Sequence, residues 1–102
     1  MEALCLYVNG CIAADDGNAR EASELFSRAQ AIFATQRRDS WTVKCMIQQA
    51  GILFDCGFFE AAEALLAFQD DVFSLDEQTA TSLMLEREMI HDYVLSDRAR
   101  RN

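Results

Sequence analysis

The amino-acid sequence repeats itself with a period of 40 residues, and this repeat limits the fold more than any other feature of the chain. Sliding the sequence along itself by 40 positions pairs seven identical residues between 5–33 and 45–73, where about two are expected by chance. The pairs are Cys5 and Cys45, Ile12 and Ile52, Asp15 and Asp55, Gly17 and Gly57, Ala22 and Ala62, Leu25 and Leu65, and Phe33 and Phe73. Periods of roughly 20–50 residues are typical of stacked supersecondary units. The sequence therefore predicts two copies of one small unit.

The composition favours helices as the building blocks of this unit. The chain of 102 residues contains no proline and four glycines, and 51% of its residues are hydrophobic. Proline and glycine are the residues that interrupt helices most strongly, and a chain of this length suits one domain with its own core. We therefore predict an all-α fold in a single domain, residues 1–102.

Apolar residues recur at helical spacing in five segments. The first repeat spans about 2–36 with helices at 2–15 and 19–36, the second spans about 40–72 with helices at 41–55 and 58–71, and a last helix covers about 75–97. The buried stripe predicted for the fourth helix consists of Phe58, Ala61, Ala62, Leu65 and Val72. After the last helix we expect a solvated terminus with Arg98, Arg100 and Arg101, and the alternative is a docking site for an acidic partner.

Residues that end and begin helices stand between these segments. Gly17 and Gly57 suit the positive φ angle of a helix end. Ser, Asn or Asp followed by Glu three residues later has the spacing of a capping box. The predicted N-terminal caps are Asn18 with Glu21, Asp39 or Ser40, and Ser74 with Glu77.

The stretch GFFEAAEALL, residues 57–66, resembles the turn and second helix of the tetratricopeptide repeat. The matching positions are Gly57, Phe59, Ala62 and Leu66 in this stretch, and Gly10, Gly17, Ala22, Phe26 and Ala29 in the first repeat, which departs from the pattern at Ala13 and Ala19. The period of 40 is closer to the long variants of this family than to the standard repeat of about 34 residues. The resemblance implies two antiparallel helix pairs plus a C-terminal capping or half-repeat helix, in a fragment of a right-handed α-solenoid.

The resemblance also implies a binding surface, because the first helix of each pair lines the concave face of such arrays. Carried over to this chain, the partner-binding groove consists of Leu4, Tyr7, Val8, Cys11, Lys44, Ile47, Gln48 and Asp55, and Arg87 and His91 join it if the last helix continues the array. The subclass that binds the C-terminal carboxylate of chaperones has Lys and Asn where this chain has Tyr7, Cys11 and Gln48, so we exclude that specificity. The alternative is that Leu4, Val8 and Ile47 belong to the core.

Several classes of chemistry are not expected. The net charge of −8 argues against nucleic-acid binding, because phosphates would be repelled. His91 is the only histidine, and the four cysteines lack the spacing of zinc ligands, so we expect no metal and no cofactor. No phosphate-binding loop or nucleophile motif appears. We therefore predict that the chain is not an enzyme.

The same residues suggest where the chain resides and how its cysteines are used. No apolar run approaches the roughly 18 residues that cross a bilayer, and no signal peptide is recognisable. We therefore expect a cytoplasmic protein without a membrane partner. All four cysteines are expected to be small buried residues, with a redox pair as the alternative.

The function that fits these observations is a protein–protein interaction module, free-standing or part of a larger regulator or scaffold. It would bind a peptide or helix of a partner in a mainly apolar groove. We expect the groove residues Tyr7 and Gln48 to contribute little to folding. Two alternatives remain: a homodimer formed through residues 75–97, and a small acidic secretion chaperone.

Overall fold

The computed structural model describes residues 2–69 and 71–101, and these residues fold into five helices without a strand. The helices are α1 (Glu2–Asp15), α2 (Ala19–Thr35), α3 (Asp39–Asp55), α4 (Phe59–Leu65) and α5 (Glu77–Arg101). The predicted all-α class is confirmed. The first three helices begin and end within two residues of the predicted bounds, whereas α4 and α5 differ.

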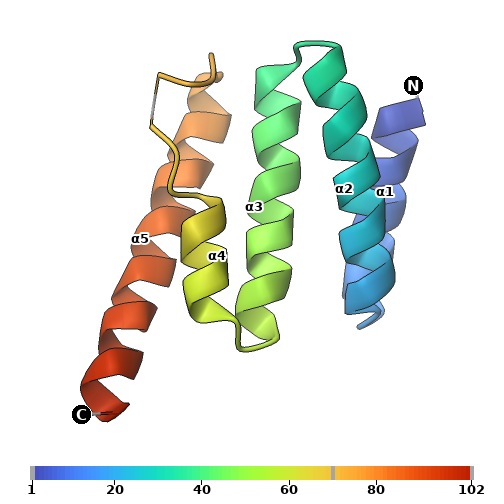
Figure 1. Ribbon diagram of the computed structural model, residues 1–102. Coiled ribbons are helices and arrows are strands. Elements are labelled where there is room, and N and C mark those ends of the chain that lie inside the picture. The colour runs from blue at the N-terminus through green and yellow to red at the C-terminus, as the bar shows by residue number, and fades with distance from the viewer. Residues whose placement is uncertain (1, 70, 102) are drawn as a thin grey trace.

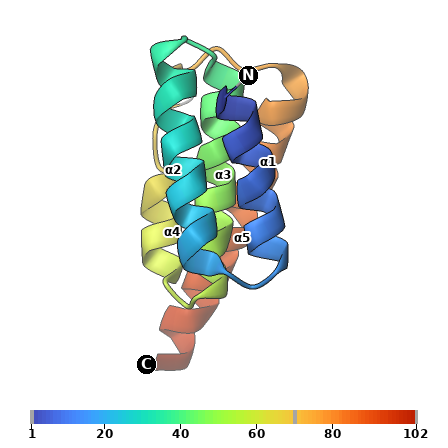
Figure 2. The ribbon, with the colours of Figure 1, turned by 90° about the vertical axis from the view of Figure 1, so that its right-hand side faces the viewer.

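The five helices form a row in chain order (Figure 1). Each helix packs against the next, and α3 also packs against α5. Helices α2 and α4 lie on one side of the row and α1 and α5 on the other (Figure 2). The shortest dimension of the molecule, 18 Å between extreme Cα positions, fits two helices whose axes are about 8–10 Å apart. The chain is therefore a slab with two broad faces and two end helices, α1 and α5.

The turns within the two helix pairs have the predicted conformation. Gly17 and Gly57 have φ angles of 79° and 89°, as expected for a residue that ends a helix in the left-handed region. The predicted cap of α2 also forms, because Asn18 Oδ1 accepts from Glu21 N at 3.3 Å and Asn18 Nδ2 donates to Glu21 Oε2 at 2.8 Å. Arg37 takes the same role between the pairs with a φ angle of 56°, which no sequence signal indicated.

The predicted caps of the later helices are wrong. Asp39 and Ser40 begin α3 but do not cap it; their side chains accept from the backbone N–H groups of Ser74 and Asp76, each at 2.9 Å. Asp76, and not Ser74, caps α5, because its Oδ1 accepts from Thr79 N at 2.7 Å. The start of α3 thus ties down the connection between α4 and α5.

Helix α4 is shorter than predicted. It ends at Leu65, whereas the predicted helix covered 58–71, of which residue 70 lies outside the described residues. The predicted stripe is wrong at three of its five residues, since Phe58 is 61% and Val72 is 58% exposed and Ala61 is exposed as well. Arg87 on α5 accounts for the early end: its Nε donates to Leu66 O at 2.8 Å and its Nη2 to Phe68 O at 2.7 Å. These carbonyl groups are satisfied by a side chain in place of a further helical turn.

Helix α5 continues to Arg101, four residues past its predicted end. Its last turns are supported by ion pairs of the terminal arginines. Arg101 lies 3.1 Å and Arg100 3.9 Å from Asp97, and Arg98 lies 3.5 Å from Glu60 of α4. The three basic side chains are exposed but belong to a helix.

The core consists of three adjoining clusters of buried side chains. The largest joins α3, α4 and α5 and contains Val43, Ala50, Ala62, Leu66, Leu83, Ile90 and Val94. The other two join α1, α2 and α3 and contain Ala3, Leu6, Ala29, Phe33 and Cys45, and Ala13, Ala22 and Phe26. The close approach of α1 to α2 depends on Gly10, since a Cβ atom there would lie 2.9 Å from the Phe26 ring.

The four cysteines do not share one environment, contrary to the prediction. Cys45 is fully buried and Cys11 is half-buried, whereas Cys5 and Cys56 are exposed. Burial raises the pKa of the Cys45 thiol to about 12, and the thiolate is the form that reacts with disulfide reagents.

We expect thiol titration of the folded protein at neutral pH to separate these groups. Cys5 and Cys56 should react within the first, fast phase, and Cys45 only at the rate at which the chain unfolds. Replacing Cys45 with Ala should remove the slowest phase and leave the fast amplitude unchanged. Fast reaction of all four thiols would contradict the packing of Cys45.

Candidate functional site: a pocket between α1, α3 and α5

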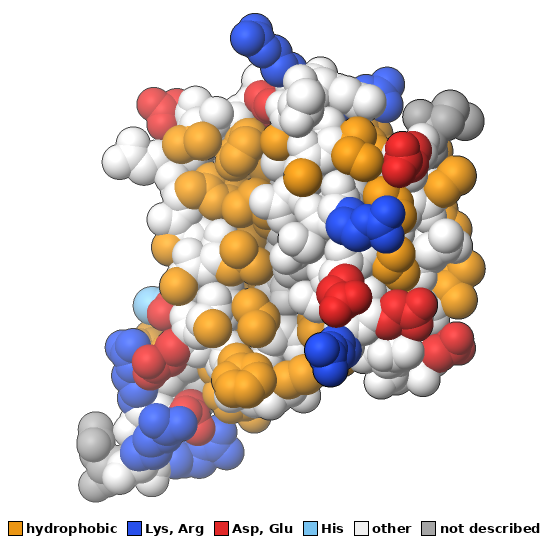
Figure 3. All heavy atoms as spheres, turned by 45° about the vertical axis from the view of Figure 1, so that its right-hand side comes forward, with side chains coloured by type: hydrophobic (Ala, Val, Ile, Leu, Met, Phe, Trp, Pro, Cys, Tyr) orange, Lys and Arg blue, Asp and Glu red, His pale blue; other side chains and the backbone are white. Residues whose placement is uncertain are grey.

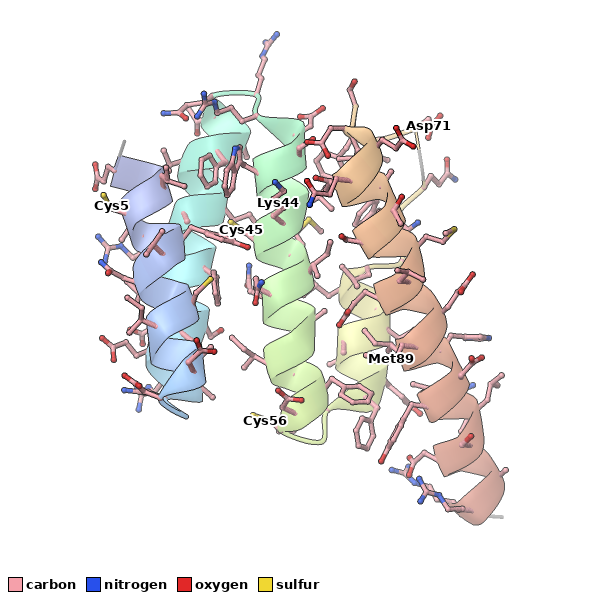
Figure 4. All side chains as sticks on the ribbon, turned by 180° about the vertical axis from the view of Figure 1, so that it is seen from behind. Cys5, Lys44, Cys45, Cys56, Asp71 and Met89 are labelled. Atoms are coloured by element: carbon pink, nitrogen blue, oxygen red, sulfur yellow. The ribbon has the colours of Figure 1, made fainter. Side chains whose placement is uncertain are left out.

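A pocket of about 250 Å³ opens on the broad face that α1, α3 and α5 form together. It is lined by Tyr7 of α1, by Trp41, Lys44, Ile47 and Gln48 of α3, and by Gln78, Thr79 and Ser82 of α5. Figure 4 views this face, with the labelled Lys44 on α3 toward the viewer. Four of the predicted groove residues, Tyr7, Lys44, Ile47 and Gln48, are therefore brought together.

Aromatic rings hold the wall of this pocket in place. The Tyr7 ring meets Phe26 and Trp41 edge-on, with centroids 5.4 and 5.3 Å away. Trp41 in turn stacks on Phe33 at 5.4 Å, and Lys44 Nζ lies 4.4 Å from the centre of the Trp41 ring. Edge-to-face and cation–π contacts of this kind favour one arrangement of the rings. The wall is thus formed before any partner arrives.

Tyr7 links α1 to α3 as well as lining the pocket. Gln48 Nε2 donates to Tyr7 Oη at 3.3 Å, and burial raises the pKa of the Tyr7 hydroxyl above its ordinary value. The ring packs against both N-terminal core clusters. The expectation that Tyr7 contributes little to folding is therefore wrong, because its ring is part of the contact between the two helix pairs.

The remaining predicted residues of α1 and α3, namely Leu4, Val8, Cys11 and Asp55, do not line this pocket. Leu4 and Val8 are 37% and 48% exposed, so they do not belong to the core, whereas Ile47 is half-buried against the largest cluster. Cys11 is half-buried, and Asp55 is exposed at the end of α3. Of the three residues that could instead have belonged to the core, only Ile47 packs against it.

Arg87 and His91 do not belong to this groove. Arg87 binds the carbonyl groups after α4, and His91 Nδ1 lies 2.7 Å from Glu63 Oε2 of α4. The buried stripe of α5, which includes Leu83, Ile90 and Val94, sets the rotation of the helix and turns both residues toward α4. The side of α5 that faces α3 carries Gln78, Thr79 and Ser82 instead.

The amino-acid sequence contained part of the information about which residues line the pocket. Gln78 and Ser82 are four residues apart, so they share a helical face, but the face that meets α3 is decided by packing. Trp41 was also missed, although it precedes Lys44 by three residues and hence lies one turn from it. A large aromatic at the start of a helix is not by itself a sign of a pocket.

The two ends of the α1–α3–α5 face differ in charge. Lys44 lies at the pocket end, whereas Asp55 ends α3 at the other end, near the labelled Cys56 in Figure 4. Burial raises the pKa of the half-buried Glu86 carboxyl of α5, and the nearby charge of Asp55 raises it further. A partner that covers this face would meet a cation at one end and two carboxyl groups at the other.

No group of three or more His, Cys, Asp and Glu residues in 2–69 and 71–101 is placed to hold a metal ion. Among the same residues, no helix is both long and apolar enough to cross a membrane. A larger hollow, about 580 Å³, lies between α5 and the connection that precedes it; it is lined by Phe73, Leu75, Ala80, Leu83, Met84, Arg87 and Glu88.

Comparison with known proteins found no relative of this chain. No protein-family model matches the chain, and neither the curated proteins nor the solved structures gave a match.

Proposed function

We propose that this chain is a protein–protein interaction module, without enzymatic activity, that binds a peptide or helix of a partner on its α1–α3–α5 face. The observation that carries the proposal is the aromatic pocket between three helices, whose wall is held by Tyr7, Trp41 and Phe33. A preformed pocket costs little conformational entropy when it is filled. One apolar side chain of a partner fits a volume of about 250 Å³.

The surroundings of the pocket support a segment rather than a small molecule as its occupant. Leu4 and Val8 continue an apolar surface along α1. Gln48, Gln78 and Ser82 place side-chain donors and acceptors around the opening, where they can bind backbone groups of an incoming chain. An apolar centre with a polar rim is the usual anatomy of a protein interface.

We further propose that the helix row is a fragment of a right-handed α-solenoid similar to tetratricopeptide arrays. The features that support this are the 40-residue repeat, the positive φ angles of Gly17 and Gly57, and the full burial of Ala62 between α4 and its neighbours. Phe59 also occupies the space between α3, α4 and α5, with its ring 5.2 Å from Phe54 and 4.6 Å from Tyr93. In such an array the α1–α3–α5 face is the concave, ligand-binding one.

The test uses Trp41, the only tryptophan of the chain, as a built-in reporter. Peptides selected from a random display library on the folded protein should carry a large apolar residue, and their titration should shift the emission of Trp41. Ser82→Tyr fills the pocket from an exposed position on α5, so it should weaken the selected peptides by at least about tenfold.

The matched control is Thr81→Tyr. It places the same side chain on the preceding residue of α5, which is also exposed but does not line the pocket. It should leave both the affinity and the change in Trp41 emission unaltered. Peptides that bind equally well to both variants, or that leave Trp41 emission unchanged, would show that the pocket is not the binding site.

A further inference from the structure

Gly51 is a glycine that the fold itself does not require. The other three glycines have a role in the structure: Gly10 makes room for the Phe26 ring, and Gly17 and Gly57 have positive φ angles. Gly51 lies inside α3, and a Cβ atom there would meet nothing within 4 Å. Glycine inside a helix is less stable than alanine. The chain therefore keeps a destabilising residue that no contact within its described part explains.

Gly51 lies on the side of α3 that belongs to the α1–α3–α5 face. Lys44, Gln48, Gly51 and Asp55 follow one another at intervals of four, three and four residues, so they share one side of the helix. Lys44 and Gln48 line the pocket, and Asp55 ends α3. Figure 4 looks onto this side. Gly51 is therefore a bare position of the helix between the pocket and the acidic end of the face.

Helix α5 presents a matching row of side chains. Ser82, Glu86, Met89 and Tyr93 have the same intervals and share one side of α5. Ser82 lines the pocket, Met89 and Tyr93 are 46% and 39% exposed, and the Tyr93 ring meets Phe54 of α3 with centroids 4.9 Å apart. Met89 is labelled on α5 in Figure 4. Exposed apolar surface thus extends beyond the pocket along the face.

Two carboxyl groups on this part of the face lack a cation. Glu86 is half-buried, and burial together with the nearby charge of Asp55 raises the pKa of its carboxyl group. Neither carboxyl group forms an ion pair or a side-chain hydrogen bond within residues 2–69 and 71–101. Arg100 is 14 residues after Glu86, about 21 Å farther along the helix, and it lies 3.9 Å from Asp97. Figure 3 shows the basic side chains of that end gathered at the lower left.

The pocket end of the face is closer to neutral. Lys44 lies near Asp76 at the start of α5; hydrogen bonds from Thr79, and to a smaller extent the charge of Lys44, lower the pKa of the Asp76 carboxyl group. The uncompensated charge of the face is therefore negative, and it lies at Asp55 and Glu86.

We propose that the partner segment on this face is a helix that lies along α3, closest at Gly51, with an apolar side chain in the pocket beside Trp41 and a lysine or arginine between Asp55 and Glu86. The inference rests on the function proposed above and names the class of its partner. The missing side chain at Gly51 lets a body about 10 Å wide approach α3 closely. The basic side chain compensates two carboxyl groups that repel each other.

The positions of the pocket and of the carboxyl groups give the spacing in the partner. Asp55 lies seven residues beyond Gln48, and Glu86 lies four residues beyond Ser82, which correspond to about 10 Å and about 6 Å along a helix. The basic residue of the partner helix therefore lies four or seven positions from the apolar anchor. Both spacings keep the two side chains on one face of the partner helix.

The probe is the set of display-selected peptides whose binding is lost in Ser82→Tyr. They should carry a lysine or arginine four or seven positions from a large apolar residue. Glu86→Gln should weaken them by about three- to tenfold, because a partly buried ion pair loses one charge. Replacing the basic residue of the peptide with glutamine should cause the same loss, and no further loss when Glu86→Gln is already present.

The matched control is Glu88→Gln, which makes the same change in charge two residues later. Glu88 is exposed on the opposite side of α5, where it borders the larger hollow, so the affinity of the peptides should not change.

Gly51 gives a second, independent measurement. Gly51→Ala should raise Tm by roughly 4–8 °C, because alanine is the better helix former, and should nevertheless weaken the peptides. Gly51→Leu should weaken them by at least about tenfold. A gain in stability together with a loss of binding is not expected of a residue that serves the fold alone. Proline placed between the anchor and the basic residue of a peptide should abolish binding, since it breaks a helix.

Several outcomes overturn this proposal and leave the binding function intact. Pocket-dependent peptides could lack the basic residue, bind Glu86→Gln as tightly as the wild type, or be unaffected by Gly51→Leu. Tolerance of proline would indicate an extended segment. If no selected peptide responds to Ser82→Tyr, the proposed function fails together with this inference.

Discussion

Ala62→Trp is expected to unfold the domain. Ala62 is fully buried in the cluster that joins α3, α4 and α5, so an indole ring there must push two helices away from α4. Overpacking by extra methylene groups already costs about 1–3 kcal/mol, and a domain of this size has roughly 5–15 kcal/mol of stability to lose. Far-UV circular dichroism during heating should show a transition shifted far below that of the wild type, or none.

The matched control for this change is Ala61→Trp, one residue earlier on the same helix. Ala61 is exposed, so its replacement should change the free energy of unfolding by no more than about 0.5 kcal/mol. If Ala61→Trp unfolds the chain and Ala62→Trp does not, the buried side of α4 has been assigned wrongly, and with it the packing of α5.

Arg87→Ala is expected to give the second-largest loss, about 2–4 kcal/mol, because hydrogen bonds from a charged group to the carbonyl groups that follow α4 are removed. The acceptors are Leu66 O and Phe68 O, and the guanidinium also lies 4.6 Å from the centre of the Phe68 ring. The loss should lower Tm by roughly 10–20 °C in a domain of this size.

Arg98→Ala serves as the control for the loss of an arginine from α5. Its ion pair with Glu60 is exposed, with 55% and 64% of the two side chains accessible, and pairs of this kind contribute about 0–1 kcal/mol.

Arg87→Ala should also leave peptide binding at the Trp41 pocket unchanged in the folded fraction. Loss of binding without loss of stability would return Arg87 to the groove, where the resemblance placed it on the condition that the last helix continues the array.

Tyr7 shows why a groove residue and a core residue cannot be told apart by sequence position. Its place on the first helix of a repeat predicted a position in the groove, and it does line the pocket. The same ring contacts Phe26 and Trp41, so replacing it with Ala would damage the fold as well as the pocket. For that reason the binding test relies on Ser82, which lines the pocket from an exposed position.

The two equivalent cysteines separate what the repeat determines from what the environment decides. Cys5 and Cys45 occupy the same place in their repeats, yet Cys45 is fully buried and Cys5 is exposed. The difference arises because α3 packs against α2 of the preceding pair, whereas α1 is the end of the row. A repeated sequence therefore predicts the unit but not the neighbours that each unit meets.

By itself the amino-acid sequence determined the helical class, the first three helices and the turns at Gly17 and Gly57, because these depend on side-chain spacing and on backbone preferences within a few residues. The resemblance to the tetratricopeptide repeat placed Tyr7, Lys44, Ile47 and Gln48 on one face, and the structure brings these four residues to one pocket. The tertiary structure alone decided where α4 ends, which residue caps α5 and which side of α5 meets α3. Each of these depends on contacts between residues far apart in the chain, such as Arg87 with Leu66 and Ser40 with Asp76. The conformational preferences of neighbouring residues do not indicate such contacts.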